Sequence, residues 1–163
     1  MNRRTSIPVL LAALFGLATV PSAATSPALT RTARRLVGTW RLVSYTAGTD
    51  DTASRRGAMP TGVLYYDAFG NMAAQISPDR ARPQFTSQRP TPEEALNAIT
   101  GYTAYFGTYT IDEKAQTVTH HVKGNLTPGG NNDGVRRFEF APGERLIIYN
   151  DRGGNKLIWE RLK

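Results

Sequence analysis

Gly38-Thr39-Trp40 opens the first strand-like run of this chain, and Trp159-Glu160-Arg161 lies in the last one. A Gly-x-Trp on the first strand with an arginine on the last is a pattern that closes one end of a small β-barrel. The glycine lets the chain turn in tightly, the indole fills the floor, and a guanidinium can stack on its face. We therefore predict that Gly38, Trp40 and Arg161 are structural residues that close the barrel.

Short alternating runs of apolar and polar residues occupy the chain between these two ends. In the first run, Trp40, Leu42 and Ser44 share one face, whereas Val43 and Tyr45 share the other. The predicted strands are residues 36–45, 62–66, 71–77, 102–111, 116–123, 134–140, 145–149 and 156–161. Strands joined mainly by hairpins predict an all-β fold, an eight-stranded antiparallel up-and-down barrel whose lumen is filled or holds one small ligand.

One short helix is predicted between the third and fourth strands. Thr91 is its N-cap, Pro92 occupies the first helical position, and Glu94 completes a capping box. Leu96 and Ile99 give the helix one apolar edge. We expect a helix with such an edge to lie across a barrel end or along the barrel side.

The first 24 residues have the pattern of an export signal. A basic start, Asn2-Arg3-Arg4, precedes an uncharged apolar run at 7–20, and Ser22-Ala23-Ala24 supplies small residues for cleavage. The apolar run is short for a membrane span, which needs about 20 residues, so an uncleaved anchor is the less favoured alternative. The chain has no cysteine, which excludes a lipid anchor and favours a bacterial periplasm over a disulfide-rich secreted domain.

These features divide the chain into a cleaved signal peptide at 1–24, a flexible basic leader at 25–35 and a barrel domain at 36–163. The predicted location is periplasmic or secreted, with no stable membrane span. The formal net charge is +7, and its arginines are scattered along the chain. Nucleic-acid-binding proteins concentrate their charge and interleave exposed aromatic residues, so no nucleic-acid partner is predicted.

The two histidines, His120 and His121, are neighbours on a predicted strand. Their side chains therefore face opposite ways and cannot ligate one metal ion together. With no cysteine to help them, we predict no metal site and no other cofactor. The chain also lacks a Gly-x-Ser-x-Gly motif, so hydrolase templates do not apply.

His120 and Arg136 are the polar residues that the strand pattern directs into the lumen. His120 shares a face with Val118, and Arg136 shares a face with Phe138 on a neighbouring strand. A buried arginine needs a carboxylate, a carbonyl or an anionic ligand. Both residues are therefore either ligand contacts or structural groups, with Arg136 satisfied by backbone carbonyls and His120 by a tyrosine.

Aromatic rings with a few convergent polar groups are typical of a small-molecule site. The remaining candidates for ligand contact are Tyr66, Tyr102, Phe106, Asn125 and Phe138. Core packing is the alternative role for the rings. On the strand of Phe106, Tyr105 and Tyr109 form the opposite face, and the pattern leaves open which face points inward.

Several blocks of this chain, in order, resemble the lipocalin-like domain of bacterial and fungal proteins. They are LVGTWRLVSY at 36–45, PTGVLYYDAFGNMAAQIS at 60–77, GYTAYFGTYTID at 101–112, TVTHHVKGNLTP at 117–128, VRRFEF at 135–140 and LIWERLK at 157–163. The resemblance implies a calycin-type barrel with a small-molecule cavity. Members that resemble this chain have no single settled function.

Three functions are consistent with such a barrel. The favoured one is an exported protein that binds a small hydrophobic or amphipathic molecule in its lumen. The second is an isomerase, cyclase or dehydratase in which His120 acts as acid or base and Arg136 stabilises negative charge. The third is a filled barrel whose arginine-rich loops bind envelope components.

Overall fold

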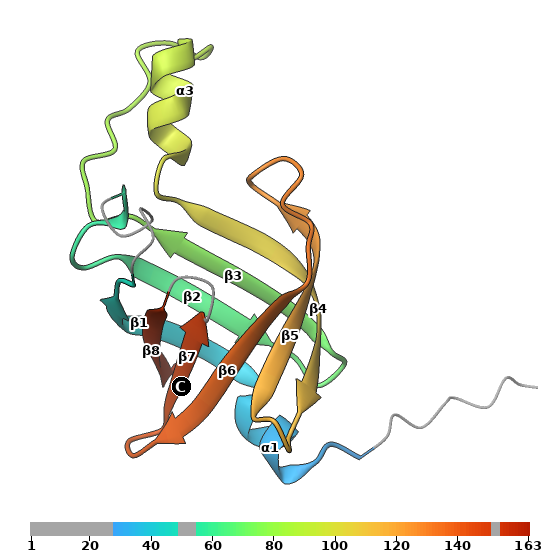
Figure 1. The fold of residues 1–163 in the computed structure, drawn as a ribbon. Coiled ribbons are helices and arrows are strands. Elements are labelled where there is room, and N and C mark those ends of the chain that lie inside the picture. The colour runs from blue at the N-terminus through green and yellow to red at the C-terminus, as the bar shows by residue number, and fades with distance from the viewer. Residues whose placement is uncertain (1–27, 49–54, 151–153) are drawn as a thin grey trace, which may run out of the picture.

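The computed structural model describes residues 28–48, 55–150 and 154–163, so the predicted signal peptide lies outside the described residues. Eight strands close into one barrel in chain order, and the eighth strand pairs with the first. Every neighbouring pair is antiparallel. The predicted up-and-down barrel is therefore confirmed, as Figure 1 shows.

The described strands agree with the predicted ones to within a few residues. The elements are α1 (Arg31–Leu36), β1 (Gly38–Thr46), β2 (Thr61–Tyr66), β3 (Asn71–Ser77), α3 (Pro92–Ile99), β4 (Thr103–Asp112), β5 (Thr117–Asn125), β6 (Gly134–Ala141), β7 (Arg145–Asn150) and β8 (Asn155–Arg161). Alternation places one face of each strand in the core. On β3, for example, Met72, Ala74 and Ile76 are buried while Asn71 and Gln75 are exposed.

Strand β1 departs from simple alternation. Its pairing with β8 shifts register between Leu42 and Ser44, and such a bulge turns the side chains that follow to the other face. Tyr45 therefore packs against the core and donates a hydrogen bond to Asn155 Oδ1 at 3.2 Å, whereas Ser44 is exposed. The predicted faces of Ser44 and Tyr45 are wrong, because a strict two-residue period does not continue through a bulge.

One end of the barrel is closed by aromatic and guanidinium groups. The Trp40 indole is buried and donates to the Leu36 carbonyl at 2.9 Å. The Arg161 guanidinium lies 4.2 Å from the centre of that ring and donates to the Val37 carbonyl at 2.7 Å. Gly38 has φ +145°, and a Cβ there would lie 2.2 Å from Arg161 Nη1. The close approach of Arg161 therefore requires glycine at this position.

The predicted flexible leader is helical in its last part. Thr30 caps α1 by accepting a hydrogen bond from the Ala33 amide, and Ala33 and Leu36 are buried. A six-residue helix is not stable alone, so its packing against the barrel floor holds it in place. The described residues thus contain two short helices, α1 and α3, where the sequence predicted one.

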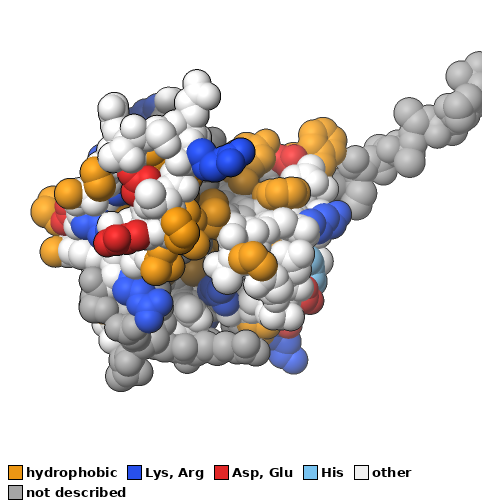
Figure 2. Space-filling model, turned by 90° about the horizontal axis from the view of Figure 1, so that it is seen from above, with side chains coloured by type: hydrophobic (Ala, Val, Ile, Leu, Met, Phe, Trp, Pro, Cys, Tyr) orange, Lys and Arg blue, Asp and Glu red, His pale blue; other side chains and the backbone are white. Residues whose placement is uncertain are grey.

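Helix α3 has the predicted N-terminus but not the predicted packing. Thr91 and Glu94 form the capping box. None of the helix residues is buried, and Leu96 and Ile99 are 63% and 48% exposed. The helix stands beyond the end of the barrel opposite α1 (Figure 1), and Figure 2 shows hydrophobic and charged side chains interspersed at this end. The expectation that its apolar edge packs on the barrel is wrong, since the loops between β3 and β4 carry the helix away from it.

Candidate functional site

The barrel holds an interior cavity of about 140 Å³. It extends from the middle of the barrel towards the end that carries α3, because Ile76 and Thr103 on its wall lie where β3 ends and β4 begins. The polar lining residues are Arg56, Thr103, Tyr105, His120, Arg136, Asn150 and Asn155, and the apolar ones are Leu64, Ala74, Ile76, Ile148, Leu157 and Trp159. No acidic residue occurs among these described lining residues.

His120 is held between two tyrosines at the centre of this arrangement. Its side chain is only 2% exposed, and its Nε2 lies 2.6 Å from the Tyr66 hydroxyl on β2. Its Nδ1 lies 2.9 Å from the Tyr105 hydroxyl on β4. Both ring nitrogens are therefore bonded, each to a phenol from a different strand.

Burial sets the protonation state of this chain of groups. Desolvation, with the nearby Arg136 charge and then His121, lowers the pKa of His120 to about 3. Desolvation also raises the pKa of both phenols, Tyr66 more than Tyr105. At neutral pH the imidazole and both tyrosines are consequently uncharged.

A neutral imidazole has one N–H donor and one acceptor nitrogen, so one tyrosine donates to His120 and the other accepts from it. Tyr66 is fully buried, and the His120 ring is the hydrogen-bond partner of its hydroxyl. A buried hydroxyl that donates to nothing is costly, so we assign Tyr66 as donor to Nε2. The Nδ1–H then donates to Tyr105, and the hydroxyl proton of Tyr105 points to the cavity.

Two arginines border the same cavity. Arg136 on β6 is half-buried, donates to the Val135 carbonyl at 3.0 Å, and lies over Gly134, where a Cβ would be 2.9 Å from Nη1. Arg56 donates to Thr103 Oγ1 at 2.7 Å, and its Nε is buried with no partner in the described part of the chain. Neither guanidinium forms an ion pair with a described residue.

Some of the predicted contact residues lie inside the barrel. Tyr66, His120 and Arg136 form or border the polar centre. Phe138 is 1% exposed, and its ring centre lies 5.6 Å from that of Phe140. Phe138 therefore faces inward as predicted, but it packs in the core rather than on the cavity wall.

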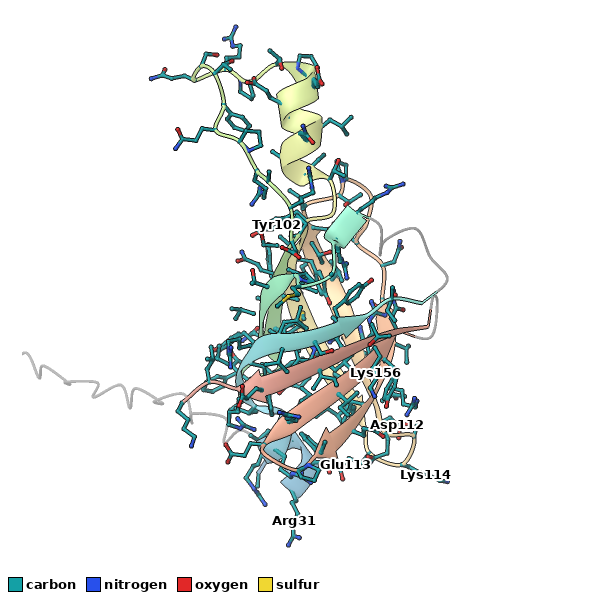
Figure 3. All side chains as sticks on the ribbon, turned by 90° about the vertical axis from the view of Figure 1, so that its left-hand side faces the viewer. Arg31, Tyr102, Asp112, Glu113, Lys114 and Lys156 are labelled. Carbon is teal, nitrogen blue, oxygen red and sulfur yellow. The ribbon has the colours of Figure 1, made fainter. Side chains whose placement is uncertain are left out.

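The other three predicted contact residues lie outside the lumen. Tyr102 precedes β4 at the α3 end, as Figure 3 shows, and its ring lies 4.8 Å from the Arg82 guanidinium carbon. Phe106 is 59% exposed on the outer face of β4, so Tyr105 and Tyr109 form the inward face. Asn125 donates to the Gly130 carbonyl at 2.9 Å and so holds the turn that follows β5.

Eleven of the thirteen described lining residues were not among the predicted contacts, and these eleven include three that carry hydrogen-bond donors, Tyr105, Trp159 and Arg56. Tyr105 lies on the strand face that the pattern left open. Trp159 shares a face of β8 with Leu157, and this two-residue spacing is a signal for an inward ring. Arg56 lies between β1 and β2 in a segment without strand periodicity, so no signal in the sequence could have found it.

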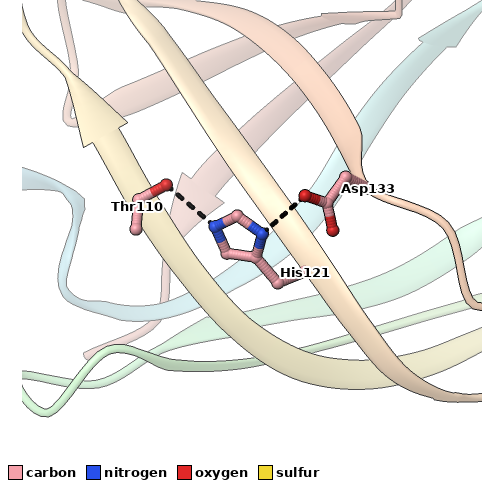
Figure 4. Close-up of polar contacts among 3 residues, drawn as sticks. All are labelled: Thr110, His121 and Asp133. Carbon is pink, nitrogen blue, oxygen red and sulfur yellow. Dashed lines mark hydrogen bonds and ion pairs between the residues drawn. The ribbon is translucent and has the colours of Figure 1, made fainter.

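The second histidine lies on the outer face, as the alternation predicts. His121 Nε2 lies 2.9 Å from Thr110 Oγ1 and its Nδ1 lies 2.9 Å from Asp133 Oδ2 (Figure 4). The order of groups is that of a nucleophilic triad. However, the Asp133 side chain is 64% exposed, and His121 is not among the residues that line the interior cavity. We interpret these contacts as a surface link between β4, β5 and the loop before β6.

No three of the described histidine or acidic side chains are grouped so that they could hold a metal ion. No helix in residues 28–48, 55–150 or 154–163 is both long enough and apolar enough to cross a bilayer.

A closed up-and-down barrel with a sealed floor and a polar interior cavity is the architecture of the lipocalin class. The sequence matches the family described as "Lipocalin-like domain" over residues 37–161, and the chain belongs to this family. Among solved structures it is similar to a DUF4847 family protein from Bacteroides vulgatus ATCC 8482. The two share 13% identity with a TM-score of 0.39, over 77% of this chain and 93% of that one. No curated protein matched the sequence.

Proposed function

We propose that this protein binds a small amphipathic molecule in the barrel lumen. The observation that carries the proposal is the interior cavity, in which a polar group of residues faces an apolar wall. Its volume of about 140 Å³ is close to that of an engineered cavity of about 150 Å³ that accommodates benzene. The ligand is therefore expected to be small.

The acid–base alternative depends on His120. A general acid or base works best with a pKa near the operating pH, whereas burial and Arg136 lower the pKa of His120 to about 3. A neutral imidazole with both nitrogens bonded to tyrosines is well suited to fixing a hydroxyl in place. These observations favour binding over proton transfer by His120.

The surface-interaction alternative depends on the loops around Arg55-Arg56 and Arg80 to Arg89, the second of which lies between β3 and α3. Arg80 donates to Asn97 Oδ1 at 3.0 Å and to the Thr100 carbonyl at 2.9 Å, and Arg82 donates to the Ala98 carbonyl at 3.0 Å. These side chains hold the loop to α3. Their structural use weakens the argument that they form a binding surface.

Native and denaturing mass spectrometry of the protein from its own host tests the proposal. A stoichiometric extra mass that is lost on denaturation is expected. Ala74 borders the cavity, so Ala74→Leu should reduce the bound fraction by filling part of it. Ala73, the next residue on β3, lies on the outer groove, and Ala73→Leu is the matched control. No bound mass after exposure to host lipid and metabolite extracts would contradict the proposal.

We also propose that the chain is exported to the periplasm or secreted after cleavage at Ala24. The basic start, the apolar run at 7–20 and the small residues at 22–24 support this. Intact-mass measurement of the protein from fractionated cells should find a chain that begins at Thr25 outside the cytoplasm. A full-length cytoplasmic chain would contradict it.

A further inference from the structure

Hydrogen-bond donors converge on the cavity from four parts of the chain. Arg56 comes from the segment between β1 and β2, Arg136 from β6, Trp159 from β8, and Tyr105 presents its hydroxyl proton from β4. Trp159 is 3% exposed, and its Nε1 has no hydrogen-bond partner in the described residues. Two residues that line the cavity, Arg56 and Trp159, therefore each have a buried donor, the Nε and the indole N–H, without an acceptor among the described residues.

The acceptors on the cavity wall are largely occupied. Asn155 Oδ1 already accepts from the Tyr45 hydroxyl and from the Gly48 amide. Thr103 Oγ1 accepts from Arg56, and His120 is bonded at both nitrogens. The cavity therefore offers donors to a ligand and few free acceptors.

The charges of the lining residues also favour a ligand that accepts hydrogen bonds, because they are positive. Arg56 and Arg136 line the same cavity as Tyr105. Burial, the larger effect, raises the pKa of the Tyr105 hydroxyl, and both positive charges lower it. No described lining residue supplies a compensating carboxylate. Partly buried guanidiniums without an anionic partner are unfavourable, and each is shaped to bind a carboxylate through two parallel hydrogen bonds.

We propose that the lumen ligand is a small organic carboxylate whose anionic group lies between Arg56 and Arg136, next to the Tyr105 hydroxyl. The inference rests on the proposed function of ligand binding and specifies its chemical class. Leu64, Ile148 and Leu157 form an apolar wall of the same cavity, so the ligand has a short hydrocarbon or aromatic body. A neutral ligand would leave the two guanidinium charges without an anionic partner.

Isothermal titration with benzoate and hexanoate, set against their neutral amides, tests the proposal on the mature chain. The carboxylates are expected to bind at least about 10-fold more tightly than the amides, because hydrogen bonds to charged groups are the stronger ones. Arg136→Met and Arg56→Met should each raise the dissociation constant of the carboxylate about 10-fold or more, with little effect on amide binding.

Arg137→Met is the matched control. Arg137 adjoins Arg136 on β6 but lies on the outer face, where its guanidinium carbon is 3.7 Å from the centre of the Tyr149 ring. Its substitution removes the same charge and should leave carboxylate affinity within about twofold, as expected for an exposed charge. Equal losses in Arg136→Met and Arg137→Met would show a general charge effect and overturn the proposed site.

The remaining outcomes separate the two proposals. If amides bind as tightly as carboxylates and Ala74→Leu weakens both, the lumen binds ligands but the anionic assignment is wrong. If neither class binds and native mass spectrometry finds no bound mass, both the assignment and the proposed function are wrong. Circular dichroism of each variant establishes that the barrel is intact before any loss is interpreted.

Discussion

Replacing Tyr66 with phenylalanine removes one hydroxyl from the most deeply buried hydrogen bond of the lumen. Tyr66 is 0% exposed and His120 2%, and their bond is 2.6 Å long. The Tyr66 ring stays in place against Tyr109, with ring centres 4.8 Å apart. The variant therefore tests the hydrogen bond with little change in packing.

The expected loss follows from what happens to His120. Whichever nitrogen carries the proton, Nε2 is left without a partner, and a buried unsatisfied polar atom costs about 1–3 kcal/mol. Tyr105→Phe is the matched control on the other nitrogen. Tyr105 borders a cavity of about 140 Å³, which is large enough for water to replace its hydroxyl. Its loss should stay below about 1 kcal/mol.

Urea unfolding at pH 7, followed by circular dichroism, measures both variants against the parent. For a domain of this size each kcal/mol lowers the melting temperature by about 3–5 °C, so thermal unfolding gives an independent reading. The reasoning is refuted if Tyr66→Phe loses no more stability than Tyr105→Phe. In that case water reaches Nε2 and replaces the lost hydrogen bond.

Three further predictions concern the pH dependence of stability, the glycine at the barrel floor and the glycine beneath the Arg136 guanidinium. The pKa of His120 is about 3 in the folded protein and about 6.5 in the unfolded chain. Between these two pH values the unfolded chain binds more protons than the folded protein, so the free energy of unfolding decreases as the pH falls. From pH 7 to pH 5 the parent should lose about 2 kcal/mol through this group, and urea unfolding of His120→Gln should show a correspondingly flatter pH dependence. In Gly38→Ala the new methyl group would clash with Arg161 Nη1, and the residue would be strained at a positive φ. Gly143 also has a positive φ but has open space around it, so Gly143→Ala is the control and should lower the stability of the barrel by roughly 1 kcal/mol. Gly38→Ala should lower it by more, and equal melting temperatures of the two variants would contradict this. Gly134→Ala displaces the Arg136 guanidinium and should weaken benzoate binding in titration while leaving thermal stability nearly unchanged.

The fold could be predicted because its signals are local. Turn residues and two-residue alternation mark each strand, and the capping box of Thr91 and Glu94 fixes the start of α3. The wrong predictions concern features that depend on contacts between distant segments of the chain. The bulge that turns Tyr45 inward is set by pairing with β8, and α1 is stabilised by burying Leu36 in the floor. Neither effect is contained in the periodicity of a single segment.

The site was predictable only in part for the same reason. Alternation placed His120 and Arg136 on inward faces, and both border the cavity. It could not choose between Phe106 and Tyr105, since both faces of that strand carry aromatic rings. Arg56 reaches the cavity from the segment between β1 and β2, where the sequence has no strand periodicity that could assign its side chain to a face.

The two tryptophans show why the polar end of the lumen is better explained by binding than by stability. The Trp40 indole donates to the Leu36 carbonyl, and an arginine covers its ring, so the floor is fully satisfied. The equally buried Trp159 has no acceptor in the described residues, and neither has the Arg56 Nε. Each such donor costs about 1–3 kcal/mol in the free protein, and an apolar side chain would remove that cost. A ligand that supplies acceptors to both recovers it, so the free energy lost by the empty barrel becomes part of the free energy of binding.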